Sequence, residues 1–476
     1  MKSIHFPFHI LTIALFIGLI VPVLIQDGMF MDGLLYTCVA KNAGNGIGTF
    51  WFPISDATWI IDGVKSFHEH PPLVFAIQSF FFKTLGNSMY VERFYSFLTA
   101  CITVLLIIFV WREIFKENKE MLKFSWLPVL FGVIVPLTHW TFQNNMQENT
   151  MGIFSLSAVY FILKGMKQQN RAFLYISISG IFIFLASFSK GVPGLFPIGA
   201  VGLYWLVYKK PSFYKAALYT VILAIIPAVI YYLLIQNPDA KEALSFYLNH
   251  RLLGRIEAAH TVSKRFHTII GLVSHLLPVL IIAAILLMVF KKKSIKNYFE
   301  QKKEFLFFIL IGLSASLPLM LTLVQKDFYF SHSIPYFGIA FALLLAPGIA
   351  LLVSKIDMEK KGFRIFKFVA YFLLVFALSF SVYNIGGQSR NSKELHDIHL
   401  IGSAIQGTEI IDIDQSIAEQ WNTRYYLVRY YNLSSSSGTN NNDYLIIQKE
   451  NTTSVPNGYQ KINLDTEKYE LFEKIK

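Results

Sequence analysis

Two carboxylates in surroundings that suit a proton acceptor follow the first apolar run of the chain. Asp27 and Asp32 lie in the segment QDGMFMDGLLYTCVAKN, among methionine, phenylalanine and leucine residues. Desolvation in such surroundings raises the pKa of a carboxylate towards values that suit a general base. The structural alternative is a carboxylate that caps the start of the next helix in contact with water. The segment therefore predicts either a general base or a helix cap.

A second polar cluster, FHEHPPL, contains His68, Glu69 and His70 immediately before two prolines. The prolines fix the backbone and start a helix over the apolar stretch 71–85. This stretch is short for a membrane span, so we expect a helix that lies in the membrane interface. Alone, the His-Glu-His triplet is as consistent with a surface turn as with a metal site, because a metal site needs further ligands from elsewhere in the chain.

The loop FYLNHRLLGRIEAAHTVSKRFH, within residues 236–267, is rich in basic side chains. Arg251 and Arg255 are four residues apart and therefore share one face of a helix, which we expect over residues 245–258. Their forked guanidinium groups suit a phosphate. The alternative is that the loop binds lipid headgroups. In either case the loop predicts contact with phosphate.

Three further charged residues stand at the ends of apolar segments. Lys190 lies in the tight turn SKGVPG, Lys326 in QKDFYFSH, and Glu148 in NNMQENT at the start of an apolar segment. Each of them, taken singly, is more often an anchor at a helix end than a site residue. Together with the acids and arginines above, they suit a reaction on a phosphate-bearing lipid at one face of a membrane.

The whole chain has 476 residues, of which 54% are hydrophobic and 15% are charged. A soluble domain has about 25% charged residues, so the composition excludes a disordered chain, a coiled coil and an ordinary cytosolic enzyme. Two cysteines, Cys38 and Cys101, are too few for a disulfide framework or a thiolate metal site. About eleven apolar segments are long enough to cross a bilayer, namely 9–26, 90–110, 124–141, 149–166, 173–189, 191–208, 214–235, 268–290, 305–324, 334–354 and 365–385.

Lysine and arginine residues are unevenly distributed between the loops, and this sets the predicted orientation. If the N-terminus is cytoplasmic, the inside loops are short and carry most of the loop positive charge, as the positive-inside rule requires. An odd number of spans then places the C-terminus outside, together with two long loops, 27–89 and 236–267. Much of the net charge of +12 is thus a topology signal and does not indicate nucleic acid.

The composition changes near residue 390. Residues 1–389 form the predicted transmembrane domain. Beyond them the chain is polar, with two strand-like runs, EIIDI and DYLIIQK, that are separated by LSSSSGTNNND. We expect residues 390–476 to form a small soluble α/β domain outside the membrane. No motif in these residues indicates a particular reaction.

Taken in order along the chain, these motifs resemble a known group of membrane enzymes. The order is MDGLLYTCVAKN, EHPPL, VERFYSFL, QEN at the start of an apolar segment, FSKGVPGLFP, the His…Arg loop and KDFYFSHSIPYF. Over residues 1–385 it resembles the polyprenyl-phosphate-sugar-dependent glycosyltransferases of the GT-C superfamily, among them bacterial aminoarabinose transferases that act on lipid A and protein O-mannosyltransferases. The predicted fold is thus an all-α polytopic membrane protein, GT-C-like, with interfacial helices and the small α/β extracytoplasmic C-terminal domain.

The resemblance implies roles for the acids. Asp32 matches the catalytic acid of the first loop in these families, and Asp27 is the fallback, because the usual acid–acid pair is here Asp–Gly. Glu69 matches the acid before the prolines. Glu148 matches a second outer-face acid that is commonly Asp, and is a third candidate catalytic residue beside Asp32 and Asp27. His70 stands where the aminoarabinose transferases tend to have Lys, which weakens a phosphate contact there.

The resemblance also implies roles for the later loop, because His250 and Arg255 match its His…Arg pair. Glu69 and His250 are then candidate ligands of a divalent metal ion, although two ligands do not establish a site. The candidate residues for the donor phosphate are Arg255, Arg251, Lys190, His70 and Lys326.

The activity that follows is inverting transfer of a hexose or pentose from a polyprenyl-phosphate donor to a lipid, protein or polysaccharide acceptor. Asp32 accepts the proton of the acceptor hydroxyl, and arginine side chains stabilise the leaving phosphate. Phosphate is a good leaving group, so neither an acid catalyst nor a nucleotide cofactor is required. The expected place is the outer face of the cytoplasmic membrane, and the expected partners are the bilayer, the lipid-linked sugar and the acceptor.

Three other functions remain open. A transporter or flippase of a lipid-linked or small anionic substrate places ionisable groups near the middle of the bilayer, and His275 is the main candidate for such a group. A scaffold protein would use residues 390–476 to recruit a partner. A polymerase or ligase of surface polysaccharide would use a similar lipid-linked donor.

Overall fold

The computed structural model describes residues 4–61, 63–254, 260–292, 300–437, 442–452 and 455–475. They form two compact units, each assembled from two stretches of the chain. The first, here called the helical unit, comprises Met1–Leu24 and Ser96–Ile385. The second, the mixed unit, comprises Ile25–Tyr95 and Gly386–Lys476. The predicted division after residue 389 stays a prediction, and the structure adds that the first long loop packs with the C-terminal segment.

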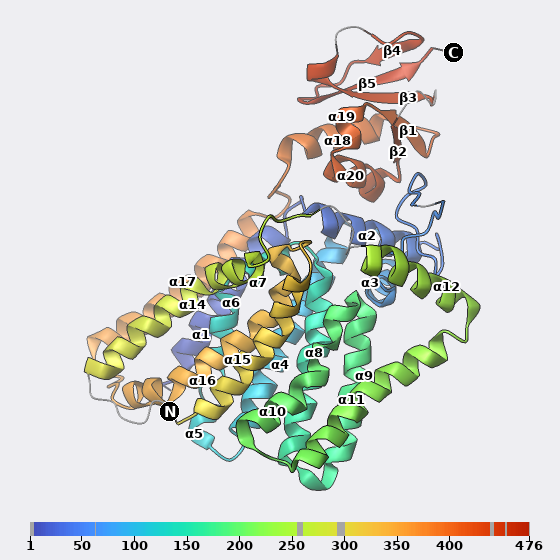
Figure 1. The fold of residues 1–476 in the computed structure, drawn as a ribbon. Coiled ribbons are helices and arrows are strands. Elements are labelled where there is room, and N and C mark those ends of the chain that lie inside the picture. Colours follow the sequence, from blue (N-terminus) through green and yellow to red (C-terminus); the bar gives the residue numbers. More distant parts are fainter. Residues whose placement is uncertain are drawn as a thin grey trace. The chain divides into compact units, whose positions relative to one another are not determined.

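The helical unit consists of helices that follow the apolar runs of the sequence (Figure 1). The helices longer than seven residues are α1 (Phe6–Leu24), α4 (Tyr90–Ile114, which starts in the mixed unit), α6 (Trp126–Val133), α7 (Pro136–Gln143), α8 (Gln147–Lys167), α9 (Ala172–Lys190), α10 (Ala200–Tyr208), α11 (Phe213–Leu234), α12 (Pro238–Phe246), α14 (His267–Lys292), α15 (Lys302–Ser316), α16 (Ile334–Val353) and α17 (Lys361–Tyr383).

Within the described residues, eight helices are long and apolar enough to cross a membrane. The count is nine if a pair of helices bent by 75°, Lys119–Val133 and Pro136–Gln143, forms one span. The bend falls at Pro136, which begins α7 after Val135 in extended conformation, as expected for the residue before a proline. The chain is a multi-pass membrane protein, and the figure of about eleven spans stays a prediction.

Besides the bent segment 124–141, two of the eleven predicted segments differ from a continuous apolar span. The segment 149–166 lies in α8, which is 21 residues long but begins with Gln, Glu and Asn and is not among the eight candidate spans. The segment 191–208 is divided into a 3₁₀ stretch, Val192–Gly199, and α10. Both departures occur where the polar motifs QEN and SKGVPG meet the apolar segments, so these motifs shape the helix ends.

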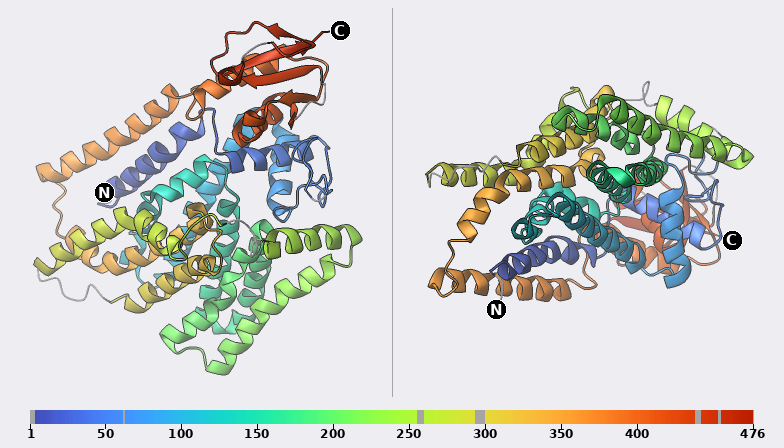
Figure 2. Two further views of the ribbon diagram at one scale, coloured as in Figure 1. Left: turned by 45° about the horizontal axis from the view of Figure 1, so that its top comes forward. Right: turned by 90° about the horizontal axis from the view of Figure 1, so that it is seen from below.

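The helices pack in pairs that bring distant parts of the sequence together. Helix α1 lies along α17 (Figure 2), and a Cβ on Gly18 of α1 would lie 3.3 Å from Cβ of Ala377. Small residues at such a contact allow the two helix backbones to approach closely. Helix α8 packs along α9, and α16 packs against both α15 and α6.

The mixed unit contains a five-stranded sheet with strand order β2-β1-β3-β5-β4. Strand β1 is parallel to β2 and β3, and β5 is antiparallel to β3 and β4. The predicted strands EIIDI and DYLIIQK are present as β1 and β3. Strand β2 lies in the serine run that the sequence analysis treated only as a separator. The bounds are β1 Ile410–Ile413, β2 Ser434–Ser437, β3 Tyr444–Gln448, β4 Tyr459–Ile462 and β5 Tyr469–Lys474.

Helices α18 (Ser392–Ala404), α19 (Gln415–Ala418) and α20 (Trp421–Tyr431) accompany this sheet, and the first long loop contributes α2 (Met31–Gly44) and α3 (Leu73–Leu85). The predicted helix over 71–85 is therefore present as α3, whereas α2 was not predicted. Helix α20 lies between α2 and the sheet (Figure 1). Residues of α2, among them Leu34 and Cys38, share one apolar core with Tyr425 and Tyr426 of α20.

A buried lysine closes the end of α20. The Lys41 ammonium donates to the carbonyl oxygens of Val428 (2.8 Å) and Arg429 (2.9 Å) and to the side-chain oxygen of Asn432 (2.6 Å). Cations are favourable at the C-terminal end of a helix, where carbonyl groups lack helical partners. Burial lowers the pKa of Lys41 to about 8, so it still carries its charge at neutral pH. Lys41 thus links α2 to the C-terminal segment.

A buried ion pair joins the same helix to the beginning of α4. Arg429 and Glu92 have side chains that are each 1% exposed, and two guanidinium nitrogens donate to the two carboxylate oxygens at 3.1 and 2.7 Å. Two further N–H groups of Arg429 donate to the carbonyl oxygens of Asn87 and Ser88. Four hydrogen bonds thus surround the guanidinium inside the mixed unit, which makes burial of both groups tolerable.

We predict that Arg429→Ala lowers the melting temperature of the full-length protein in detergent by several degrees. Breaking a buried pair leaves Glu92 charged and unpaired, which costs about 3–5 kcal/mol. Arg364→Ala is the matched control, because Arg364 pairs with Glu359 on the surface, where the two side chains are 67% and 82% exposed. An equal effect of the two substitutions would contradict the importance assigned to Arg429.

Candidate active site

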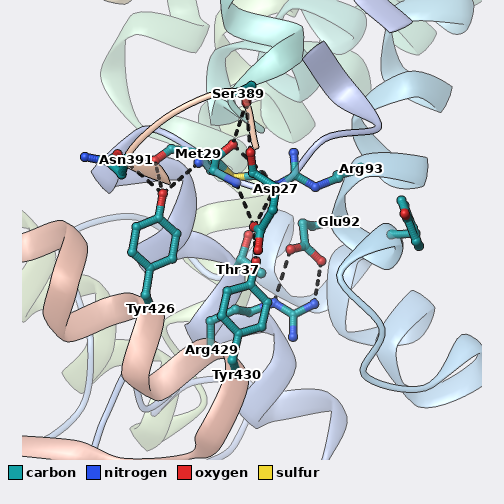
Figure 3. A network of polar contacts seen from close by, with 12 residues as sticks. Asp27, Met29, Thr37, Glu92, Arg93, Ser389, Asn391, Tyr426, Arg429 and Tyr430 are labelled. Atoms are coloured by element: carbon teal, nitrogen blue, oxygen red, sulfur yellow. Dashed lines mark hydrogen bonds and ion pairs between the residues drawn. The ribbon is translucent and has the colours of Figure 1, made fainter. Parts of the chain in front are cut away.

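Asp27 lies at the centre of a polar network in the mixed unit (Figure 3). Its Oδ1 accepts hydrogen bonds from the backbone N–H of Gly28 (2.6 Å) and from the Tyr430 hydroxyl. Its Oδ2 lies 3.2 Å from Nε2 of His399, and the guanidinium of Arg93 lies 3.7 Å from Oδ1. Asp27 is only 6% exposed. Its carboxylate is thus held by four groups from three parts of the sequence.

The surroundings of Asp27 lower the pKa of its carboxylate, whereas the sequence predicted that they raise it. Burial by itself raises the pKa of Asp27, but hydrogen bonds from His399, Tyr430 and Gly28, together with the charge of Arg93, outweigh it. The net result is a pKa below the ordinary value. The expectation of a raised pKa was therefore wrong for Asp27, because the sequence around it did not disclose its partners. A carboxylate stabilised in its charged form is a weak base.

Asp32 is in a different situation, in the first turn of α2. The residue is half-buried, and its carboxylate makes no hydrogen bond or ion pair with any side chain or N–H among the described residues. The N-cap of α2 is Phe30, so neither Asp32 nor Asp27 has the predicted alternative role of N-cap residue.

The His-Glu-His triplet is folded back onto its own loop and α2. Nε2 of His70 lies 3.0 Å from the Tyr36 hydroxyl, and Nε2 of His68 lies 2.7 Å from the hydroxyl of Ser66. Burial lowers the pKa of His68 to about 4, so this ring is neutral at physiological pH. Glu69, between them, is half-buried. The triplet therefore does not present three ligands to one point.

In the helical unit, Glu148 and Lys190 form a buried ion pair. Glu148 is the second residue of α8 and Lys190 the last residue of α9. Nζ of Lys190 lies 2.7 Å from Oε1 of Glu148, with the two side chains 7% and 0% exposed. The same ammonium lies 5.7 Å and 6.0 Å from the ring centres of Tyr329 and Phe328. The structure thus combines two residues that the sequence analysis named separately.

Two glycines fix the turn that carries Lys190. Gly191 ends α9 with a φ of +87°, a conformation that L side chains rarely adopt. Gly194 follows three residues later, and a Cβ at this position would overlap the backbone of Ala186. The motif SKGVPG thus holds the Lys190 side chain against Glu148.

The other predicted phosphate-binding residues lie near the ends of neighbouring elements. Arg251 and His250 belong to a π-helical segment, η3 (Tyr247–Leu253), that continues α12. The predicted helix over 245–258 is helical through residue 254, and its remaining residues lie outside the described part of the chain. The imidazole of His250 is stacked on Phe246 at 4.1 Å. Arg255 lies outside the described residues. Lys326 has its Nζ 5.6 Å from the ring centre of Phe328, the residue that also lies beside Lys190.

Several residues of these networks were not singled out from the sequence. Asp327 follows Lys326, and its carboxylate lies 3.3 Å from Nε2 of His267 and 3.1 Å from Nε2 of His275. The histidines are eight residues apart on α14, hence on one face of the helix, and this spacing was the available signal. Arg93 was visible only as part of the motif VERFYSFL, and no local pattern indicated His399 or Tyr430.

The structure gives no direct support to the predicted metal ligands Glu69 and His250. Glu69 belongs to the mixed unit and His250 to the helical unit. Across the described ranges, no group of three or more His, Cys, Asp or Glu side chains could share one ion. A divalent ion at these two residues therefore stays a prediction.

The fold is similar to those of ArnT and of an archaeal oligosaccharyltransferase. Over 98% of this chain and 97% of the other, with 12% sequence identity, the structure matches ArnT from Cupriavidus metallidurans bound to undecaprenyl phosphate at a TM-score of 0.66. It also matches the oligosaccharyltransferase of Archaeoglobus fulgidus in complex with Zn and sulfate at a TM-score of 0.52, with 13% identity over 93% of this chain and 68% of the other. The predicted GT-C-like fold is therefore confirmed.

The sequence itself points to the same group of enzymes. Residues 69–235 match a family described as dolichyl-phosphate-mannose-protein mannosyltransferase. A comparison with the curated proteins found no match. The family match and the fold together confirm the predicted resemblance, and they agree with the predicted activity of glycosyl transfer in a membrane.

We predict that the double substitution Glu148→Leu, Lys190→Met leaves the melting temperature nearly unchanged but lowers glycosyl transfer about 100-fold or more. Replacing both members of a buried pair with apolar residues of similar size is often neutral for stability, whereas loss of a fixed charge at a reacting phosphate costs about 100- to 1,000-fold in rate. Transfer at the wild-type rate in this stable variant would show that the pair is only structural.

Proposed function

We propose that this protein is an integral-membrane glycosyltransferase that moves a sugar from a polyprenyl-phosphate donor to a hydroxyl of a lipid, protein or polysaccharide acceptor. The observation that carries the proposal is the likeness in fold, over nearly the whole chain, to an enzyme whose structure contains undecaprenyl phosphate. A structure of the archaeal oligosaccharyltransferase AglB contains dolichol-phosphate and an inhibitory peptide. The match to a dolichyl-phosphate-mannose family supports the same donor chemistry.

Asp32 acts as the general base. Its carboxylate accepts the proton of the acceptor hydroxyl while the hydroxyl oxygen attacks the anomeric carbon of the donor sugar. A carbon–oxygen bond forms on one face of the sugar, and the bond to the donor phosphate breaks on the other. The electron pair of that bond leaves with the phosphate, so the anomeric configuration inverts. The lack of competing partners in the described structure supports Asp32, whereas Asp27 is already engaged by Gly28, Arg93, His399 and Tyr430.

Positive side chains stabilise the charge that develops on the leaving polyprenyl phosphate. Arg255 is the main candidate, and Arg251 and Lys190 assist it. Their fixed charges act most strongly where water is excluded, and Lys190 is 8% exposed. Glu148 holds the Lys190 ammonium in one orientation and reduces the cost of burying it. His70 is a weaker candidate, because it already contacts Tyr36. Lys326, whose ammonium lies beside the ring of Phe328, is a further weaker candidate.

The transfer takes place at the outer face of the cytoplasmic membrane. The N-terminus is cytoplasmic and the C-terminal segment extracytoplasmic, as the excess of lysine and arginine in the short loops favours. The donor then lies with its polyprenyl chain in the bilayer and its phosphate at the interface. No step requires a nucleotide, and a divalent ion held by Glu69 and His250 would serve to orient the phosphate.

The transporter alternative is not favoured. The buried pair Glu148–Lys190 lies at the ends of α8 and α9, whereas transport requires ionisable groups deep in the bilayer. His275, the candidate for such a group, is paired with Asp327. The described structure therefore supports chemistry at an interface more than passage through the bilayer.

We predict that Asp32→Asn lowers the rate of sugar transfer at least about 100-fold, because a positioned general base contributes about 100- to 10,000-fold. The measurement is transfer of labelled sugar from a polyprenyl-phosphate donor in membranes that contain equal amounts of folded protein.

Asp27→Asn is the matched comparison. It removes a carboxylate five positions earlier, and we expect a lower melting temperature with transfer per folded molecule largely retained. The assignment of the base would be overturned by the reverse pattern, in which Asp27→Asn abolishes transfer and Asp32→Asn does not.

A further inference from the structure

A cavity of about 340 Å³ lies entirely within the mixed unit, away from Asp27 and Asp32. It is lined by Thr58 and Trp59 of the first long loop, by Trp421 and Arg424 from the start of α20, and by the serines at 435–437 of strand β2. Ligand sites usually measure about 300–1,000 Å³, so this cavity has room for a small ligand of one or two rings. No residue of this cavity takes part in the proposed reaction.

The walls of the cavity are held in place by hydrogen bonds between the loop and β2. The Thr58 hydroxyl donates to the carbonyl oxygen of Ser435 (2.9 Å), and the backbone N–H of Ala57 donates to the hydroxyl of Ser434 (2.9 Å). Asp56 accepts from the backbone N–H of Thr58. These bonds fix a loop that has no regular structure of its own, so the cavity is formed before a ligand arrives.

Arg424 is the cation that lines this cavity, and part of its hydrogen-bonding capacity is available to a ligand. Nε of Arg424 donates to the hydroxyl of Ser435 (3.1 Å), and the guanidinium lies over the ring of Trp421, with 5.5 Å between its carbon and the ring centre. Within the described residues, neither of its terminal nitrogens has a hydrogen-bond acceptor. A planar guanidinium with two donors available suits a phosphate or a carboxylate.

Aromatic rings form another side of the cavity. Trp59 is 6% exposed and meets Trp421 at an interplanar angle of 67° with 6.1 Å between ring centres. Trp421 is 41% exposed, although burial of so large an apolar ring is favourable. An exposed tryptophan beside hydroxyl groups is the combination that sugars require, because the C–H face of a sugar packs on an aromatic ring while its hydroxyls form hydrogen bonds.

The sequence of β2 supports a binding role for its serines. Four successive serines, Ser434–Ser437, form this strand at the edge of the sheet. Serine offers little of the branched or aromatic packing that strands favour. A local departure of this kind is expected at functional sites, where another requirement replaces local stability. Here Ser435, Ser436 and Ser437 line the cavity, and the hydroxyl of Ser435 accepts a hydrogen bond from Arg424.

We propose that this cavity binds a saccharide that carries a phosphate or a carboxylate group. Arg424 binds the anionic group, the serine and threonine hydroxyls bind the sugar hydroxyls, and Trp421 packs against the ring. Its use as a subsite for the acceptor glycan rests on the proposed glycosyltransferase function, whereas binding of the saccharide does not. A peptide added to the β2 edge would need neither the arginine nor the tryptophans, so the lining favours a sugar.

The test measures binding of glucose 6-phosphate, glucuronate, glucose and inorganic phosphate to the full-length protein in detergent, by saturation-transfer NMR without any donor. We expect both anionic sugars to bind at least about tenfold more tightly than glucose or phosphate alone, because charge-assisted hydrogen bonds add to the sugar contacts. Arg424→Gln removes the advantage of the anionic sugars over glucose, and Trp421→Ala weakens binding of all the sugars.

Lys461→Gln is the control, because Lys461 is a partly exposed cation on β4 at the opposite edge of the same sheet, and we expect it to leave binding unchanged. The proposal is overturned if no sugar binds, if inorganic phosphate binds as well as glucose 6-phosphate, if Arg424→Gln binds like the wild type, or if an uncharged extended peptide displaces the sugars. Asp32→Asn should retain sugar binding. Sugar binding by a protein without transfer activity would contradict the proposed function and leave the cavity assignment standing.

Discussion

The pairing of buried charges is the constraint on which the rest of this structure depends. An ionised side chain away from water is stable only when an opposite charge or a full set of hydrogen bonds meets it. In the mixed unit, Arg429 and Glu92 satisfy each other, and Lys41 closes the end of α20. Because α20 is held at both its side and its end, the C-terminal segment and the first long loop form one body.

The need to pair buried charges also distinguishes Asp27, whose carboxylate is bound by other groups of the fold, from Asp32, the proposed general base. Asp27 was the natural rival of Asp32 on sequence grounds, but its four partners lower its pKa and occupy its oxygen atoms. Asp32 begins a buried helix without such partners. In the helical unit, Glu148 pairs with the buried ammonium of Lys190.

Sequence patterns predicted the parts of the structure that depend on local information. Long apolar runs predicted the helices, and the short strand-like runs EIIDI and DYLIIQK predicted β1 and β3. The partners of Asp27 could not be predicted, because His399 is 372 positions away in the chain and Tyr430 is 403 away. Strand β2 was missed because four serines carry no hydrophobic period. Glu148 and Lys190 were named singly, since nothing local shows that α8 and α9 bring them together.

The central claim is that the protein breaks the bond between a sugar and a polyprenyl phosphate, and the most direct measurement follows that bond. Purified protein in detergent, where no compartments exist, is given a polyprenyl-phosphate sugar labelled in the sugar, together with an envelope extract as acceptor. The account predicts that free polyprenyl phosphate and labelled acceptor appear in equal amounts. A donor that stays intact in detergent, while vesicles containing the protein carry it across their bilayer, would contradict the account and identify a transporter.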